Sequence, residues 1–202
     1  MFILLVSVTC DGTVLPFQAV YQGLTEQSLP QPSAPCYNDC IKAGFHFEFS
    51  GTKTYWSNQK TMRTFADHIL APYFAEAKAK AGCPSSQQTM WQIDVWAVHR
   101  SEEFQTWMCE NHPTITVIFV PGGCTGVVQP CDVGVQRPLK LSVKQSYHEV
   151  LVNEVLEQTK EGKALTIDNQ IGTHHNHSVQ WLWNAYAAIN QPDLIKMVCT
   201  HL

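Results

Sequence analysis

The chain has 202 residues, of which 45% are apolar, 15% charged and 10% aromatic, and its formal net charge is −4 at pH 7. This length suits one domain with a hydrophobic core, and the apolar fraction excludes a disordered chain. No apolar run reaches the roughly 18–20 residues of a membrane-spanning helix, so no membrane partner is predicted. The mild acidity argues against non-specific adhesion to nucleic acid or anionic membranes, which usually requires a basic surface.

The start of the chain is apolar but does not resemble a signal peptide. Residues 1–8 lack a basic n-region, and no small-x-small cleavage pattern follows them. Asp11-Gly12 separates the apolar runs at 2–9 and 14–21. Because Asp-Gly between two apolar runs is the strongest short-range hairpin signal, a β-hairpin is predicted here.

The eight cysteines are spread along the chain and form no C-x-x-C pair. A chain of this length folds without disulfide bonds, so we expect reduced, mostly buried thiols and an intracellular protein.

The middle of the chain alternates between loop and regular structure. A loop is predicted over 23–35, a short helix over 36–43 and a strand over 45–49, where phenylalanine alternates with polar residues. Apolar residues at helical spacing predict a helix from Thr61 to Gly82, kinked or split at Pro72.

Two strands and the helix between them form the next unit. A strand is predicted over 89–95, and Ser101 caps a helix with two glutamates in its first turn. The β-branched run at 114–120 is typical of a strand covered on both faces. The connection through one helix makes the two strands parallel, in a mixed α/β sheet with helices on both faces.

The last third is predicted to be helical. A glycine-rich loop at 121–126 leads into a helix from about 132 towards 162, and residues 162–176 have no regular pattern. A helical face follows around residues 179–186, and Pro192 opens a final short helix.

Two aspartates mark the predicted carboxyl ends of the parallel strands. Asp94 closes the first strand, and Asp132 follows the loop after the second. Ligands bind at this edge of open α/β sheets, and two carboxylates there suit a divalent cation such as Mg²⁺ or Mn²⁺. Two metals about 3.5–4 Å apart would support phosphodiester cleavage. The alternative is that both residues are helix-capping acids.

Basic residues follow Asp132 at helical spacing. Arg137, Lys140, Lys144 and His148 fall on one face, which suits contact with a phosphate backbone, although a solvated helix face is the alternative. His99 lies five residues after Asp94. It is predicted to contact a phosphate or to orient the site, unless it is an ordinary loop histidine.

Two segments together resemble a known family. Residues 91–104 (WQIDVWAVHRSEEF) and 119–135 (FVPGGCTGVVQPCDVGV) are similar to the DDE superfamily endonuclease domain of pogo, Tigger and jerky-like transposases and the host proteins derived from them. In that family an aspartate closes a strand with a histidine five residues on, and a loop runs into Gln-Pro-x-Asp-x-Gly. The residues that match this second motif are Gln129, Pro130, Asp132 and Gly134.

The resemblance implies an RNase H-like fold, with a DDE-type domain over residues 1–160 and a helical tail over 161–202. It implies metal-dependent DNA cleavage and strand transfer, with Asp94 and Asp132 as catalytic metal ligands for Mg²⁺ or Mn²⁺. His99, Arg137, Lys140 and Lys144 would then bind DNA, in a nuclear protein.

The chain also departs from the family pattern. The family's first acid lies on a central strand upstream of the hairpin, and this chain begins at the hairpin, so we expect a sheet without that strand. Asp11 cannot substitute, because a strand of about 7 residues at ~3.3 Å each places the turn over ~20 Å from the crevice. Val95 stands where many relatives have asparagine. We therefore predict that this chain alone is inactive, marginally folded and only a weak or non-specific DNA binder.

Two other interpretations remain open, and so does homo-oligomerisation. One is a non-catalytic, domesticated DNA-binding or scaffold protein. The other is a zinc-binding module built from residues 173–177 or from Cys36 and Cys40, although no tetrahedral spacing joins them. The glycine-rich loop is not a P-loop, because no Gly-Lys-Ser/Thr follows it. The net charge is a sum over the whole chain, which combines acidic residues at the predicted sheet edge with a basic helix face after Asp132. It therefore does not exclude a nucleic-acid partner.

Overall fold

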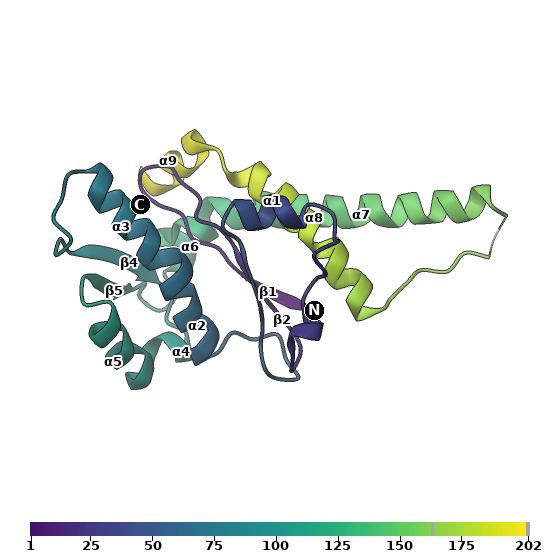
Figure 1. The fold of residues 1–202 in the computed structure, drawn as a ribbon. Helices are drawn as coiled ribbons and strands as arrows, with labels where there is room; N and C mark the ends of the chain where they lie inside the picture. The colour runs from purple at the N-terminus through teal and green to yellow at the C-terminus, as the bar shows by residue number, and fades with distance from the viewer. Residues whose placement is uncertain (163, 201–202) are drawn as a thin grey trace.

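A computed structural model describes residues 1–162 and 164–200 (Figure 1). The strands are β1 (Phe2–Leu5), β2 (Gln18–Tyr21), β3 (His46–Phe49), β4 (Thr89–Ile93) and β5 (Ile115–Phe119). The helices are η1 (Glu26–Ser28), α1 (Tyr37–Lys42), α2 (Gln59–Phe65), η2 (Ala66–Leu70), α3 (Ala71–Lys80), α4 (Ala97–Arg100), α5 (Glu102–Asn111), α6 (Thr125–Val128), η3 (Cys131–Val135), α7 (Gln136–Lys160), α8 (Ile171–Ile189) and α9 (Pro192–Thr200).

The predicted hairpin is confirmed. β1 and β2 pair antiparallel, and Gly12 takes the positive φ of +99° that the tight turn requires. The pairing register changes by one residue between the Leu5–Gln18 pair and the Val8–Val14 bridge. Pro16 lies within this change and has no N–H to donate to the ladder, so the regular strands are shorter than predicted.

The strands form two separate sheets. β1, β2 and β3 form one sheet, in which β2 and β3 are parallel, and β4 and β5 form a second, parallel sheet as predicted. The mixed α/β class, with strands flanked by helices and a helical C-terminal region, is confirmed. The single mixed sheet expected from the sequence is not seen, because no strand in residues 1–162 and 164–200 pairs with both β1 and β4.

Two hydrophobic cores accompany the two sheets. The first joins β2 and β3 to α1, α7, α8 and α9. The second joins β4 and β5 to α2, η2 and α5, and Leu5 and Leu15 from the hairpin pack against it. The described chain from Ile171 to Thr200 consists mainly of α8 and α9, and α8 contributes Val179, Leu182, Ala185 and Ile189 to the first core. Beyond this core, α7 continues as an extended arm (Figure 1).

Several expectations need correction. The irregular segment predicted over 162–176 is too long, because α8 begins at Ile171. β5 is not covered on both faces, since Thr116 and Ile118 are exposed. The thiols are free but not mostly buried, because only Cys40 is fully enclosed. The break in the long helix is a π-helical turn at η2, which precedes Pro72 in the first turn of α3.

No helix in the described part of the chain is long and apolar enough to cross a membrane.

Candidate active-site edge and DNA-facing helix

The carboxyl ends of β4 and β5 lie next to each other, and Asp94 follows the first of them. The backbone N–H of Val120 donates to the carbonyl of Ile93 at 2.8 Å, which joins the two strand ends. Gln92 Nε2 donates to the carbonyl of Val128 at 3.0 Å, so the loop after β5 returns to β4 at α6. The half-exposed Asp94 side chain therefore lies at the edge where the sequence predicts ligand binding.

His99 lies inside the protein and is paired with Asp94. Its Nδ1 is 3.2 Å from Asp94 Oδ1 and 3.2 Å from the Asp94 carbonyl oxygen. The His99 side chain is 11% exposed and makes an edge contact with Trp96, with ring centroids 5.3 Å apart. Its Nε2 is buried and has no hydrogen-bond partner among the described residues. This geometry favours the orienting role predicted for His99 over direct contact with a phosphate.

Asp132 is exposed in the π-helical turn η3, directly before α7. Its backbone N–H donates to the carbonyl of Gln129 at 3.0 Å. The neighbouring Cys131 thiol lies 3.7 Å from the carbonyl of Val6, and burial raises the pKa of Cys131 to about 12. The turn that carries Asp132 is therefore packed against the hairpin and buries Val135 in the first core.

The remaining motif residues shape this turn. A Cβ on Gly134 would lie 2.3 Å from Val198 Cγ2, so glycine allows α9 to pack against η3. Pro130 precedes η3 with helical φ and ψ angles of −51° and −42°. Gln129 is half-buried, and its Oε1 has no partner among the described residues. The motif thus has a packing role at Gly134 in addition to placing Asp132.

The basic residues after Asp132 lie on the exposed side of α7. Arg137, Lys140, Lys144 and His148 are all exposed. Leu139 and Ser146 mark the opposite, buried side of the helix, where Asn184 of α8 donates to Ser146 Oγ at 2.9 Å. The spacing of the basic residues therefore produces one solvent-facing row.

One contact at this edge was not predicted. Gln59 Nε2, at the start of α2, donates to Ser101 Oγ at 2.6 Å, and Ser101 caps α5 two residues after His99. The loop at 51–58 is thereby joined to the segment that holds Asp94. In the sequence, this loop is marked by the adjacent pair Tyr55-Trp56, which lies between Lys53 and Lys60.

The described residues do not by themselves fit a metal centre. No group of three or more His, Cys, Asp or Glu side chains in residues 1–162 and 164–200 is arranged to hold a metal ion. Asp94 and Asp132 each offer the oxygen ligands that Mg²⁺ and Mn²⁺ prefer, but neither belongs to such a group in the described part of the chain. Two residues of the predicted zinc module have structural partners: His175 Nδ1 contacts the Ser28 carbonyl at 2.8 Å, and the buried Cys40 Sγ lies 3.8 Å from the Val179 carbonyl.

Comparison with known proteins gives one match. A family model described as DDE superfamily endonuclease matches residues 2–194. No curated protein and no solved structure matches the chain.

Proposed function

The chain belongs to the DDE superfamily endonuclease family, and on that premise we propose that it binds the DNA backbone through the exposed face of α7. The observation that carries the proposal is the row of exposed basic residues that begins five positions after Asp132. Asp94 and Asp132 would then lie near the bound phosphates, as the family's metal-dependent chemistry requires.

The charge distribution along α7 supports DNA binding at this place. Residues 136–148 contain three fixed positive charges and no aspartate or glutamate, and the first acid of the helix is Glu149. The overall charge of −4 is therefore reversed locally on this face. If all three basic residues neutralise phosphates, log K should fall against log salt with a slope of about −2.7, from about −0.9 per contact.

Fluorescence anisotropy with a labelled DNA duplex tests this proposal. Lys140→Ala and Lys144→Ala should each weaken binding, and each should make the salt slope less steep by about 0.9. Lys80→Ala is the matched control, because Lys80 is an exposed lysine on α3 paired with Glu76. If the α7 variants change binding no more than Lys80→Ala does, the proposal is wrong.

We also propose that this chain by itself does not cleave DNA. Two carboxylates without a third ligand hold a divalent metal weakly, and binding of the ground state is not catalysis. Supercoiled plasmid incubated with Mg²⁺ or Mn²⁺ should therefore stay intact. Nicking that disappears in Asp132→Ala would refute this part of the proposal and would restore the endonuclease function to this chain.

The finer assignments follow from the same premise. We place the chain with the transposase-derived pogo, Tigger and jerky-like members on the Gln129–Gly134 motif, and we propose a nuclear location. A non-catalytic host role in binding DNA is the second candidate. The division into a DDE-type unit over 1–160 and a helical segment over 161–202 remains a proposal.

A further inference from the structure

A pair of stacked aromatic rings lies at the surface, in the loop before α2. The Tyr55 and Trp56 rings have centroids 5.3 Å apart and an interplanar angle of 25°. Trp56 is 55% exposed, whereas the other five tryptophans are half-buried or buried. Exposing a large aromatic surface is unfavourable in water, so this ring needs an explanation other than core packing.

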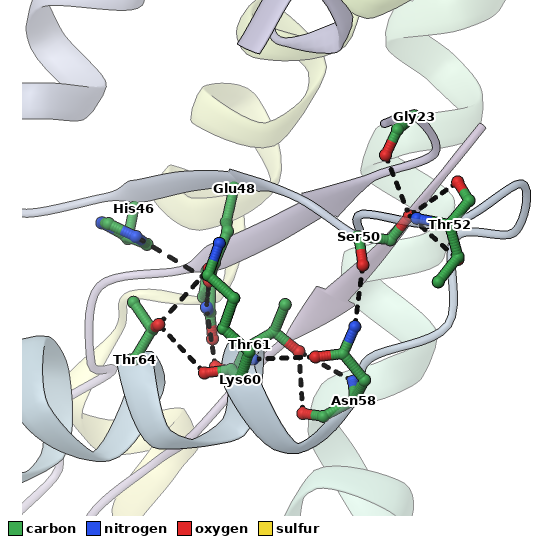
Figure 2. Close-up of polar contacts among 10 residues, drawn as sticks. Gly23, His46, Glu48, Ser50, Thr52, Asn58, Lys60, Thr61 and Thr64 are labelled. Atoms are coloured by element: carbon green, nitrogen blue, oxygen red, sulfur yellow. Dashed lines mark hydrogen bonds and ion pairs between the residues drawn. The ribbon is translucent and has the colours of Figure 1, made fainter. Parts of the chain in front are cut away.

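The loop that presents the pair is held in place by a network of hydrogen bonds (Figure 2). Asn58 Nδ2 donates to the Ser50 carbonyl at 2.8 Å, and Ser50 Oγ donates to the Thr54 carbonyl at 2.5 Å. Thr52 forms a bridge with Gly23, which ties the loop to the end of β2. The loop that carries the two rings is therefore ordered before binding, which lowers the entropic cost of binding.

Lysines flank the pair in the sequence, at positions 53 and 60. Lys53 is exposed on the loop, and the Lys60 side chain is 68% exposed at the start of α2. Lys60 Nζ lies 3.6 Å from Glu48 Oε1 (Figure 2). The same Nζ lies 4.8 Å from the Phe49 ring centroid. The Glu48 carboxylate is itself buried and accepts a hydrogen bond from Gln18 Nε2 at 2.8 Å.

We infer that the Tyr55–Trp56 pair is a stacking platform for an unpaired base, so that the DNA bound by this chain includes a single-stranded stretch. The inference rests on the proposed DNA-binding function and specifies its substrate. Flat aromatic faces beside lysines are the pattern by which proteins bind single strands, whereas the bases of a duplex are already stacked on each other. The Gln59–Ser101 bond joins the start of α2, three residues after Trp56, to the N-cap of α5, seven residues after Asp94.

The test compares three labelled DNAs: an oligothymidine, the same strand with abasic sites, and a duplex. Trp56→Ala should weaken oligothymidine binding by about 5-fold to 150-fold, the range expected for the loss of one stacked base. Trp56→Phe should retain most of the affinity. Leu165→Ala is the control, because Leu165 is 62% exposed on the loop after α7 and its replacement also removes an exposed apolar side chain. Abasic sites should weaken binding by the wild type but not by Trp56→Ala.

The outcomes separate this inference from the proposed function. If Lys144→Ala weakens binding to all three DNAs and Trp56→Ala changes none of them, DNA binding stands and the platform is refuted. If Trp56→Ala weakens duplex and single-strand binding equally, the pair contributes without stacking on a base, which also refutes the platform. If the wild type binds no DNA at all, both proposals are wrong. Circular dichroism confirms that each variant folds.

Discussion

Replacing Gly134 by alanine tests whether the turn that carries Asp132 depends on contact with α9. The new Cβ would lie 2.3 Å from Val198 Cγ2 and 3.2 Å from Cγ1, whereas ordinary contacts are 3.4–4 Å. Val198 is 4% exposed, and its β-branched side chain has one strongly preferred rotamer in a helix, so it cannot turn aside easily. The Cβ falls 1.1 Å short of the 3.4 Å at which ordinary contact begins, so α9, η3 or both must move to relieve the clash.

Overpacking of this kind destabilises the folded state by about 1–3 kcal/mol, whereas replacing glycine by alanine in a helix stabilises it by about 1 kcal/mol. We expect Gly134→Ala to lower the free energy of unfolding by about 1 kcal/mol, which corresponds to a fall in Tm of about 2–4 °C for a domain of this size. Urea unfolding followed by circular dichroism measures the change, and an unchanged m value would show that the unfolded state is not altered.

A double-mutant cycle isolates the clash. Val198→Ala removes the two methyl groups that the new Cβ would meet, so the double variant should be more stable than the sum of the two single effects predicts, by about 1–3 kcal/mol. Gly172→Ala on α8 is the matched control, because a Cβ added there would meet nothing within 4 Å and no loss is expected. If Gly134→Ala behaves like Gly172→Ala, or if the two effects simply add, the packing explanation is refuted.

Three further predictions concern the elements around the site. Asn58→Ala should cost about 1–2 kcal/mol, because it removes the capping box in which Asn58 Oδ1 accepts from Thr61 N at 3.1 Å. Thermal unfolding measures this loss, and Asn58→Asp should recover only part of it, because it keeps the capping oxygen but loses the Nδ2 bond to the Ser50 carbonyl. Ser101→Ala should cost about 1 kcal/mol by removing the N-cap bond from Phe104 N, and amide exchange should accelerate in α5 but not in α8. The pKa of His46 is lowered because burial disfavours its charged form. The His46 imidazole therefore binds a proton more readily in the unfolded chain than in the folded one. The folded state should keep its stability above about pH 6.5 and become less stable as the pH falls below that value. Tm measurements across the pH range should show a smaller decrease for His46→Gln.

Features that depend on neighbouring residues could be predicted from the sequence. The Asp11-Gly12 hairpin, the Ser101 cap and the parallel pairing of β4 with β5 follow from short-range signals and chain connectivity. The positions of Asp94 and Asp132 after strand ends follow from the same strand assignments. Such features are specified by local propensities, which a single sequence displays directly.

Features that depend on distant residues could not be predicted in this way. The close approach behind Gly134 involves Val198, and the partner of Gln59 is Ser101, far along the chain in both cases. The start of α8 at Ile171 has no clear sequence signal, because its first turns are rich in histidine and asparagine, which have weak helix propensity and gain stability here from packing. The exposure of Ile118 depends on which element covers β5. β-branched residues are favoured in strands whether a face is covered or not, so the sequence does not show which face is exposed.

The separation of the two sheets has a consequence for how the molecule opens. Backbone hydrogen bonds do not connect β1–β3 with β4–β5 in the described part of the chain, and each sheet has its own hydrophobic core. Side-chain contacts such as those of Leu5 and Leu15 join the hairpin to the second core. We therefore expect the unit that holds Asp94 and His99 to unfold locally as a separate cooperative element, while the helices around β2 keep their amides protected. Hydrogen exchange in β4 and β5 would then report the stability of the Asp94 edge alone.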